Sequence, residues 1–207
     1  MPDLNYENPE VRARMGNVVD YWLDFGFDGL RVDAVKYIYE VDYDNDPSTP
    51  LIMSDAEKSR EFFAEFREEL LEPYDTLGYA KFMVMVVENW TSTAFLDTYA
   101  EWDGKELAQM SFDFDIGSAV YDVVLGSSTR SSADSHANYL SDRQTYGLPA
   151  DFRYANFLSN HDNVRSRPMT LTGGDEHAAA LAASYSILSP GVPFVYYGNE
   201  VGETGLK

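Results

Sequence analysis

The stretch that decides the fold is KFMVMVVE, residues 81–88, a nearly continuous apolar run that ends in a glutamate. Strands of a parallel sheet that are buried on both faces have this pattern, whereas half-exposed strands alternate apolar and polar residues. Further short strands are expected at residues 27–34, 107–114, 154–159 and 192–197. Short strands separated by helical stretches predict βαβ units and therefore an α/β fold with a parallel sheet.

The clearest predicted helix covers residues 9–25. Asn8 suits the N-cap, Pro9 suits the first helical position, and Gly26 suits the left-handed residue that follows a helix. Apolar residues recur at steps of four and three, which predicts the stripe by which this helix packs. The stripe consists of Val11, Met15, Val18, Trp22 and Phe25.

Further helices are expected at about residues 55–71, 94–101, 117–126, 135–145 and 175–188. They alternate with the strands along the whole chain. We find no linker rich in serine and glycine and no low-complexity tract. One domain over residues 1–207 is therefore the simplest expectation.

The composition excludes several classes of function. The chain has 207 residues, 35 acidic against 15 basic side chains, and a formal net charge of −20, which argues against nucleic acid and anionic membranes as partners. It has no cysteine, which excludes disulfides and cysteine nucleophiles. No apolar run is long enough to span a membrane. The first residues have no features of a signal peptide. The composition does not indicate a cellular location.

Three carboxylates stand at equivalent positions, at or just after the ends of predicted strands. Asp33 ends the first strand, Glu88 ends the second, and Asp162 follows the fourth. The carboxyl ends of parallel strands share one rim, where ligands bind. A single acid at such a position usually caps a helix or pairs with an arginine. Three together favour a functional site at this rim.

Converging carboxylates without a phosphate loop or a cysteine indicate glycoside chemistry, which needs one ionised and one protonated carboxyl group. Arg31 lies two residues before Asp33 on the same strand face, where it would stabilise the ionised form of Asp33. Glu88 ends a very apolar strand, where desolvation would raise its pKa. These environments predict that Asp33 is the nucleophile and Glu88 the general acid/base.

Five segments in order resemble motifs of the α-amylase family of glycoside hydrolases (family 13). They are MPDLN at 1–5, GLRVDAVK at 29–36, VENW at 87–90, FLSNHD at 157–162 and GVPFVYYG at 191–198. The resemblance implies a partial (β/α)₈ TIM barrel, with strands four to eight present and the first three strand–helix units missing.

The resemblance also implies retaining hydrolysis of α-glucosidic bonds. It makes Asp33 the nucleophile, Glu88 the acid/base, and Asp162 the residue that holds sugar hydroxyls and stabilises the transition state. The MPDLN-like start favours α-1,4 bonds of starch and maltooligosaccharides. An α-glucan oligosaccharide or polysaccharide is thus the implied partner, and the family favours an extracellular location.

Other side chains are expected to bind the substrate. By resemblance, Arg31 and His161 would line the same sugar subsite as Asp33, and Lys36 would meet the leaving-group side. Tyr37 and Trp90 stand just past strand ends, where their rings could stack on sugars.

The chain departs from the family pattern in three places. Tyr37 stands where many members carry a histidine whose backbone carbonyl helps to bind calcium, and Asn199 replaces an acid common after the last strand. The family motif in which an aspartate and an asparagine are followed by a histidine is absent. The resemblance implies calcium, but its usual ligands are largely missing, so we expect no resident metal.

Three functions stay open at this point. An active α-glucan hydrolase is expected first, because all three carboxylates are present. A transglycosidase would use the same residues, since the outcome depends on whether water or a sugar reaches the intermediate. A non-catalytic glucan-binding relic of a truncated barrel is the third. The incomplete barrel has two equal explanations. Two chains could join their half-barrels as a homo-oligomer, or the chain could come from a truncated gene or be a proteolytic fragment.

Overall fold

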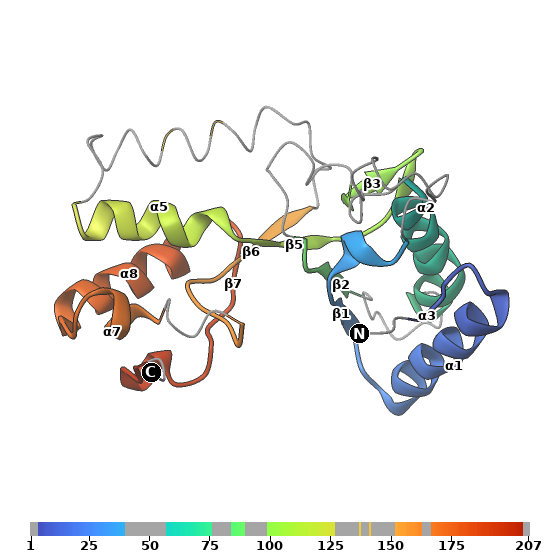
Figure 1. Cartoon of the computed structure of the whole chain (residues 1–207), viewed down its shortest axis with the longest axis horizontal. Helices are drawn as coiled ribbons and strands as arrows, with labels where there is room; N and C mark the ends of the chain where they lie inside the picture. The colour runs from blue at the N-terminus through green and yellow to red at the C-terminus, as the bar shows by residue number, and fades with distance from the viewer. Residues whose placement is uncertain are drawn as a thin grey trace, which may run out of the picture. The chain divides into compact units, whose positions relative to one another are not determined.

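A computed structural model describes residues 4–39, 57–75, 84–89, 99–126, 137, 141, 152–162 and 167–204. The chain divides into two compact units, Met1–Ser111 and Phe112–Lys207, and each is described by itself (Figure 1). The expectation of a single domain over residues 1–207 stays a prediction.

The first unit is built from helices and short parallel strands. Its elements are α1 (Pro9–Phe25), β1 (Gly29–Val32), η1 (Val35–Tyr37), α2 (Glu57–Phe66), the π-helical turn η2 (Arg67–Leu71), α3 (Glu72–Asp75), β2 (Val84–Val87), β3 (Glu101–Trp102), β4 (Lys105–Glu106) and β5 (Met110–Asp113). β2 pairs in parallel with both β1 and β5, while β3 and β4 form a small antiparallel hairpin. The core of this unit collects on β2 and around it, where Met85 and Val87 are fully buried.

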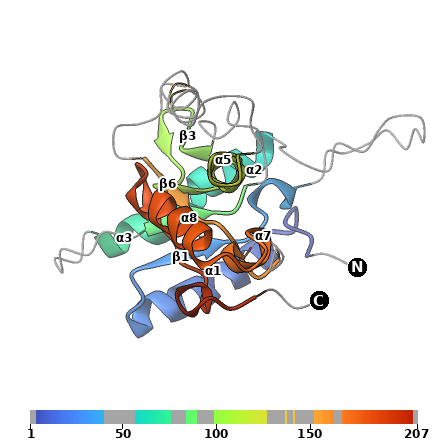
Figure 2. The same ribbon diagram turned by 90° about the vertical axis from the view of Figure 1, so that its left-hand side faces the viewer.

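In the second unit, helices and short strands again alternate along the chain. Its elements are α5 (Asp115–Val124), β6 (Arg153–Asn156), α7 (Pro168–Leu171), α8 (Glu176–Leu188), β7 (Val192–Pro193) and η5 (Asn199–Val201). α8 lies beside α5 and α7 (Figure 2). β6 and β7 are parallel, and the strand order is β1-β2-β5-β6-β7, in which β5 runs from the first unit into the second. The predicted α/β fold with a parallel sheet is confirmed.

Local signals set the ends of α1 as predicted. The side chain of Asn8 accepts a hydrogen bond of 2.9 Å from the Glu10 N–H, which caps the start of the helix. Gly26 takes the left-handed conformation with φ 109°, and its N–H donates to the Leu23 carbonyl. The helix therefore covers residues 9–25, as the sequence predicts.

The predicted packing face of α1 is wrong. Val18, Trp22 and Phe25 are 47%, 45% and 71% exposed, whereas Gly16 and Leu23 are buried. A Cβ at Gly16 would lie 3.6 Å from Leu70 Cδ1, an ordinary van der Waals distance, so Gly16 lies against η2 with space for a methyl group. Leu23 belongs to the core of the unit, so the buried side of α1 lies at Gly16 and Leu23 rather than along the predicted stripe.

The exposed face of α1 carries a group of rings that we call the aromatic cluster: Tyr21, Trp22, Phe25 and Phe27. Their ring centroids lie 5.3–6.5 Å apart in edge-to-face and stacked pairs. Phe27 lies two residues before β1, which among the described strands pairs on one side only, with β2. The aromatic cluster is therefore close in sequence to a strand that has one neighbour within the described part of the sheet.

The other elements agree with the predictions in part. The strands are shorter than expected, and the β3–β4 hairpin and α7 were not predicted. The predicted helix at 94–101 is wrong at its end, because Glu101 belongs to β3, and its residues 94–98 lie outside the described residues. The helix expected at 135–145 also lies outside them, apart from Ala137 and Ser141. No helix within the described ranges is long and apolar enough to cross a membrane.

Candidate active site

Strand register places the ends of β1 and β2 next to each other. Val32 lies opposite Val87, so the next residues, Asp33 and Glu88, leave the two strands at the same level. The Glu88 N–H donates to the Val32 carbonyl at 2.8 Å, and the Val35 N–H donates to the Glu88 carbonyl at 3.1 Å. The backbone itself therefore fixes the two carboxylate-bearing residues side by side.

Glycine permits this close approach of the strands. A Cβ at Gly29 would lie 2.1 Å from the carbonyl oxygen of Val84, a distance that no side chain could tolerate. Gly29 opens β1 and faces Val84 at the start of β2. The first residue of β1 must therefore be glycine for the register of the whole pair to hold.

Arg31 joins the two carboxylates. Its Nη1 forms an ion pair with Asp33 Oδ1, and its Nη2 donates to Glu88 Oε2 at 2.7 Å. The side chain of Asp33 is 70% exposed, whereas that of Glu88 is only 10% exposed. One guanidinium thus contacts two carboxylates, of which that of Asp33 is exposed to water and that of Glu88 is largely buried.

The pKa of Glu88 is raised above its ordinary value of 4.5. Burial of the carboxyl is the largest cause, and a hydrogen bond to Asp33 and the charge of Asp33 also raise the pKa. The guanidinium of Arg31 and the backbone N–H of Ala34 oppose the rise. The balance favours a Glu88 that keeps its proton longer than an exposed glutamate does, as the sequence predicts.

The turn after β1 contains a residue that the sequence did not single out. Ala34 has φ 47° and ψ 42°, the left-handed region that non-glycine residues rarely adopt. This conformation costs on the order of 1 kcal/mol, and it directs the Ala34 N–H to the carboxylate of Glu88. The residue type gives no sign of this role, because alanine carries no functional group.

Lys36 and Tyr37 follow on η1. Lys36 is buried to 9% exposure, and its Nζ lies 5.2 Å from the ring centroid of Tyr37, within range of a cation–π contact. Tyr37 is 46% exposed, and its stacking on a sugar stays a prediction. Trp90, the other expected stacking residue, lies outside the described residues.

Asn89 is a second residue that sequence reasoning missed. It directly follows Glu88 and is only 1% exposed, yet among the residues that the structure describes neither polar atom of its side chain has a hydrogen-bond partner. A buried carboxamide without partners is costly and is rare in proteins. The sequence signal that could have identified Asn89 is its position directly after the end of a predicted strand.

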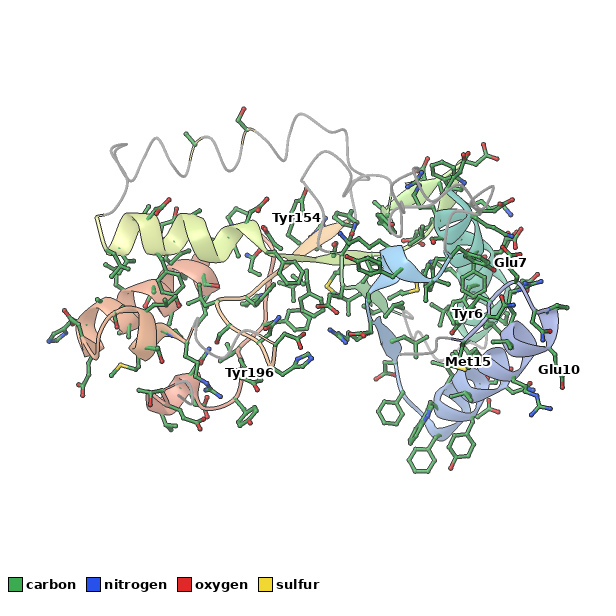
Figure 3. All side chains as sticks on the ribbon, in the orientation of Figure 1. Tyr6, Glu7, Glu10, Met15, Tyr154 and Tyr196 are labelled. Atoms are coloured by element: carbon green, nitrogen blue, oxygen red, sulfur yellow. The ribbon has the colours of Figure 1, made fainter. Side chains whose placement is uncertain are left out.

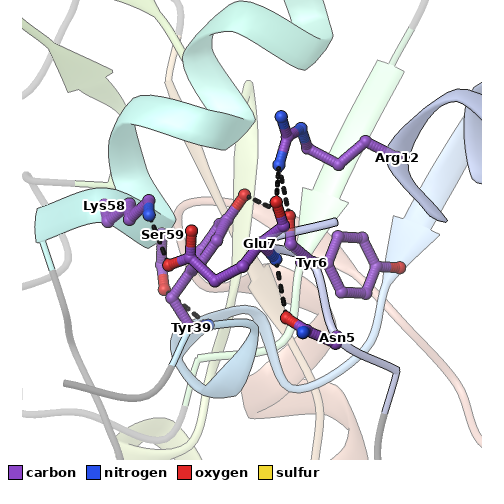
Figure 4. Close-up of polar contacts among 7 residues, drawn as sticks. All are labelled: Asn5, Tyr6, Glu7, Arg12, Tyr39, Lys58 and Ser59. Atoms are coloured by element: carbon purple, nitrogen blue, oxygen red, sulfur yellow. Dashed lines mark hydrogen bonds and ion pairs between the residues drawn. The ribbon is translucent and has the colours of Figure 1, made fainter. Parts of the chain in front are cut away.

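The segment before α1 is tied to the segment after β1 (Figure 4). The hydroxyl of Tyr39 donates to the Tyr6 carbonyl at 3.1 Å, and Arg12 donates to the same carbonyl. Lys58 forms an ion pair with Glu7, which joins this group to α2. Tyr6 and Glu7, which follow the MPDLN motif in the sequence, are thereby attached to Tyr39 and α2.

The second unit holds the remaining predicted site residues. His161 Nε2 lies 3.2 Å from Asp162 Oδ2, and the side chain of Asn160 accepts a hydrogen bond of 3.1 Å from the Asp162 N–H. The structure thus brings Arg31, Asp33 and Glu88 together in one unit, and His161 with Asp162 in the other. Convergence of Asp162 with the first group stays a prediction.

A resident calcium ion has no visible support in the described part of the chain. Calcium takes six to eight oxygen ligands. Within the described ranges, no three His, Cys, Asp or Glu side chains lie close enough to hold a metal. The prediction that the chain has no resident metal nevertheless stays a prediction.

Comparison with known proteins decides the family. A family model described as the α-amylase catalytic domain matches residues 1–207. The chain belongs to the α-amylase family. α-Amylase 3 of Dictyoglomus thermophilum is 30% identical over 100% of this chain and 36% of its own length. The 4-α-glucanotransferase of Thermotoga maritima is 29% identical over 99% of this chain and 38% of its own length.

Solved structures agree with this assignment. The crystal structure of the α-amylase from H. orenii matches with a TM-score of 0.77 at 28% identity, over 100% of this chain and 37% of that one. The fold of this α-amylase family member is therefore a partial TIM barrel. The chain spans little more than a third of the length of the relatives it matches.

The raised pKa of Glu88 predicts a pH dependence of stability. A glutamate whose pKa is higher in the folded state stabilises the fold below pH 4.5, and that stability is lost as the pH rises through the folded pKa. Glu88→Gln removes this titration. The free energy of unfolding of the wild type, minus that of Glu88→Gln, should therefore fall as the pH rises above 4.5, in urea titrations.

Glu61→Gln, at an exposed position on α2, is the matched control for the general effect of removing one charge. It should show no such fall. If the difference in the free energy of unfolding between the wild type and Glu88→Gln stays constant or grows with pH, the raised pKa of Glu88 in the folded state is contradicted.

Proposed function

We propose that this α-amylase family member is a retaining glycoside hydrolase that cleaves α-1,4-glucosidic bonds of starch and maltooligosaccharides. The observation that carries the proposal is the unequal exposure of two carboxylates joined by Arg31. Retaining hydrolysis needs a nucleophile that is ionised and an acid that is protonated on the two sides of one bond. Exposed Asp33 and buried Glu88 supply this pair.

In the first step, the ionised carboxylate of Asp33 attacks the anomeric carbon, and the bond from that carbon to the leaving oxygen breaks. Glu88 donates its proton to that oxygen, so the leaving sugar departs as an alcohol. The product of this step is an ester between the sugar and Asp33. The two carboxyls of a retaining site stand about 5–5.5 Å apart.

In the second step, Glu88 acts as a base. It takes a proton from water, the water oxygen attacks the anomeric carbon, and the ester bond to Asp33 breaks. The enzyme returns to its starting protonation state. The raised pKa of Glu88 serves both steps, because a carboxyl group that titrates nearer to neutral pH exchanges protons more readily with the sugar oxygen.

The remaining side chains are assigned to sugar binding. Asp162 and His161 would hold sugar hydroxyls and Lys36 would meet the leaving-group side, as the family resemblance implies. The exposed ring of Tyr37 offers an apolar face to a sugar, and Trp90 is expected to offer another.

Transglycosylation is the second candidate. The similarity to a 4-α-glucanotransferase favours it, since the same two steps transfer the sugar when a second sugar replaces water. A glucan-binding protein without activity is the third candidate. The two enzymatic functions differ in their products: transfer makes chains longer than the substrate, and hydrolysis does not.

Replacement of the proposed nucleophile tests the enzymatic function. Asp33→Asn should lower the release of reducing sugar from soluble starch by at least about 10³-fold, because an amide cannot form the sugar ester. Asp103→Asn is the matched control, since exposed Asp103 has φ 49° and asparagine tolerates that conformation. Equal release from the wild type and Asp33→Asn would leave glucan binding as the function.

We also propose that two chains associate through the aromatic cluster and the free edge of β1. Large exposed rings beside an unpaired strand edge are typical of surfaces that another chain covers. The net charge of −20 repels a second copy, so salt should favour the association.

Light scattering at low and high salt checks the association. The dimer fraction should rise with salt, and Phe25→Ser should lower it, because the serine removes the most exposed ring of the cluster. Leu125→Ser, at an exposed position after α5, should leave it unchanged. A monomer at every salt concentration would contradict the proposal.

A further inference from the structure

The second unit contains a buried arginine that the proposed reaction does not use. Arg167 is 3% exposed, and its Nη1 donates to the Tyr197 carbonyl at 2.9 Å and to Asn199 Oδ1 at 3.4 Å. The same Nη1 lies 3.2 Å from Glu203 Oε2. Its guanidinium carbon lies 4.7 Å from the ring centroid of Tyr196, which is labelled in Figure 3. One guanidinium therefore organises the whole segment 196–203.

The backbone of this segment is shaped to fit the arginine. Gly198 has φ 86°, and a Cβ there would lie 2.0 Å from Glu203 Oε2 and 2.8 Å from Arg167 Nη1. The Glu203 N–H donates to the Gly198 carbonyl at 2.8 Å. A buried guanidinium needs partners for its donors, and this segment supplies three oxygen partners around Nη1.

Asn199 extends the contacts to the segment that carries Asp162. Its Nδ2 donates to Ser159 Oγ at 2.9 Å, and Ser159 Oγ lies 3.2 Å from Asn199 Oδ1. Ser159 is 2% exposed and immediately precedes Asn160, whose side chain accepts from the Asp162 N–H. Asn199 thus contacts the chain before Asp162 through Ser159, and the chain after it through Arg167.

We propose that Asn199 and Arg167 are positioning residues, which fix the segment around Asp162 by holding it on both sides. The proposal rests on the proposed function, in which Asp162 holds the sugar. The side chain of Asp162 is 52% exposed, so packing does not fix it, and its place depends on the backbone. A catalytic group that is held loosely loses rate even when it is present.

The donor and the acceptor of the Asn199 side chain decide what each substitution at this position would change. An asparagine can donate to Ser159 and accept from Arg167 at the same time. An aspartate could accept both from the Ser159 hydroxyl and from Arg167, so it would preserve both contacts. An alanine would remove both.

The test uses Asn199→Ala, Ser159→Ala, their double variant and Asn199→Asp. Arg167 itself is left intact, because a buried cation with several partners is needed for folding. The first readout is the order parameter of the backbone amides of residues 160–162 by NMR. It should fall from about 0.85 to below about 0.6 in Asn199→Ala and Ser159→Ala, and stay high in Asn199→Asp.

The second readout is kcat and KM on a maltooligosaccharide. We expect kcat to fall at least about 10-fold in each alanine variant with KM changed less than about 2-fold. The double variant should be no worse than Asn199→Ala, because that variant already loses the contact with Ser159 as well as the contact with Arg167. Wild-type order or wild-type kcat in Asn199→Ala would overturn the inference, as would additive losses. If amide order falls while the wild type itself lacks activity, the positioning holds and the proposed function fails.

Discussion

The guanidinium of Arg31 contacts Asp33 and Glu88 at once, and the rest of the proposed chemistry depends on this contact. Two carboxylates at neighbouring strand ends repel each other when both are ionised, and a shared cation reduces that repulsion. The environments of the two acids are nevertheless unequal. Water reaches Asp33, while burial raises the pKa of Glu88. Two residues with the same functional group are thus prepared for different roles by their surroundings.

The β1–β2 pair produces this asymmetry. The approach at Gly29 sets the register, the register places Asp33 and Glu88 at one level, and the left-handed turn at Ala34 directs a backbone N–H to Glu88. Each of these is a property of the backbone rather than of a reactive side chain. In the second unit, the proposed positioning role of Asn199 is comparable, because Asn199 contacts Ser159 three residues before Asp162.

Much of this could be predicted from the sequence, because it rests on local signals. The caps of α1 at Asn8 and Gly26, the buried strand β2 and the pairing of Arg31 with Asp33 all depend on residues close together in the chain. The buried face of α1 could not be predicted, because Gly16 packs against a helix far along the chain. The hairpin at β3–β4 and the contacts of buried arginines also depend on partners distant in sequence. The strain at Ala34 has no signature in the residue type.

The most direct measurement is the chemical trapping of the sugar ester. The chain is incubated with an α-glucosyl fluoride that carries a second fluorine on the ring, which slows hydrolysis of the ester, and the peptides are examined by mass spectrometry. The account predicts one glucosyl group attached to Asp33. A label on Glu88 or Asp162, or release of fluoride without any label, would contradict the assignment of Asp33 as the nucleophile.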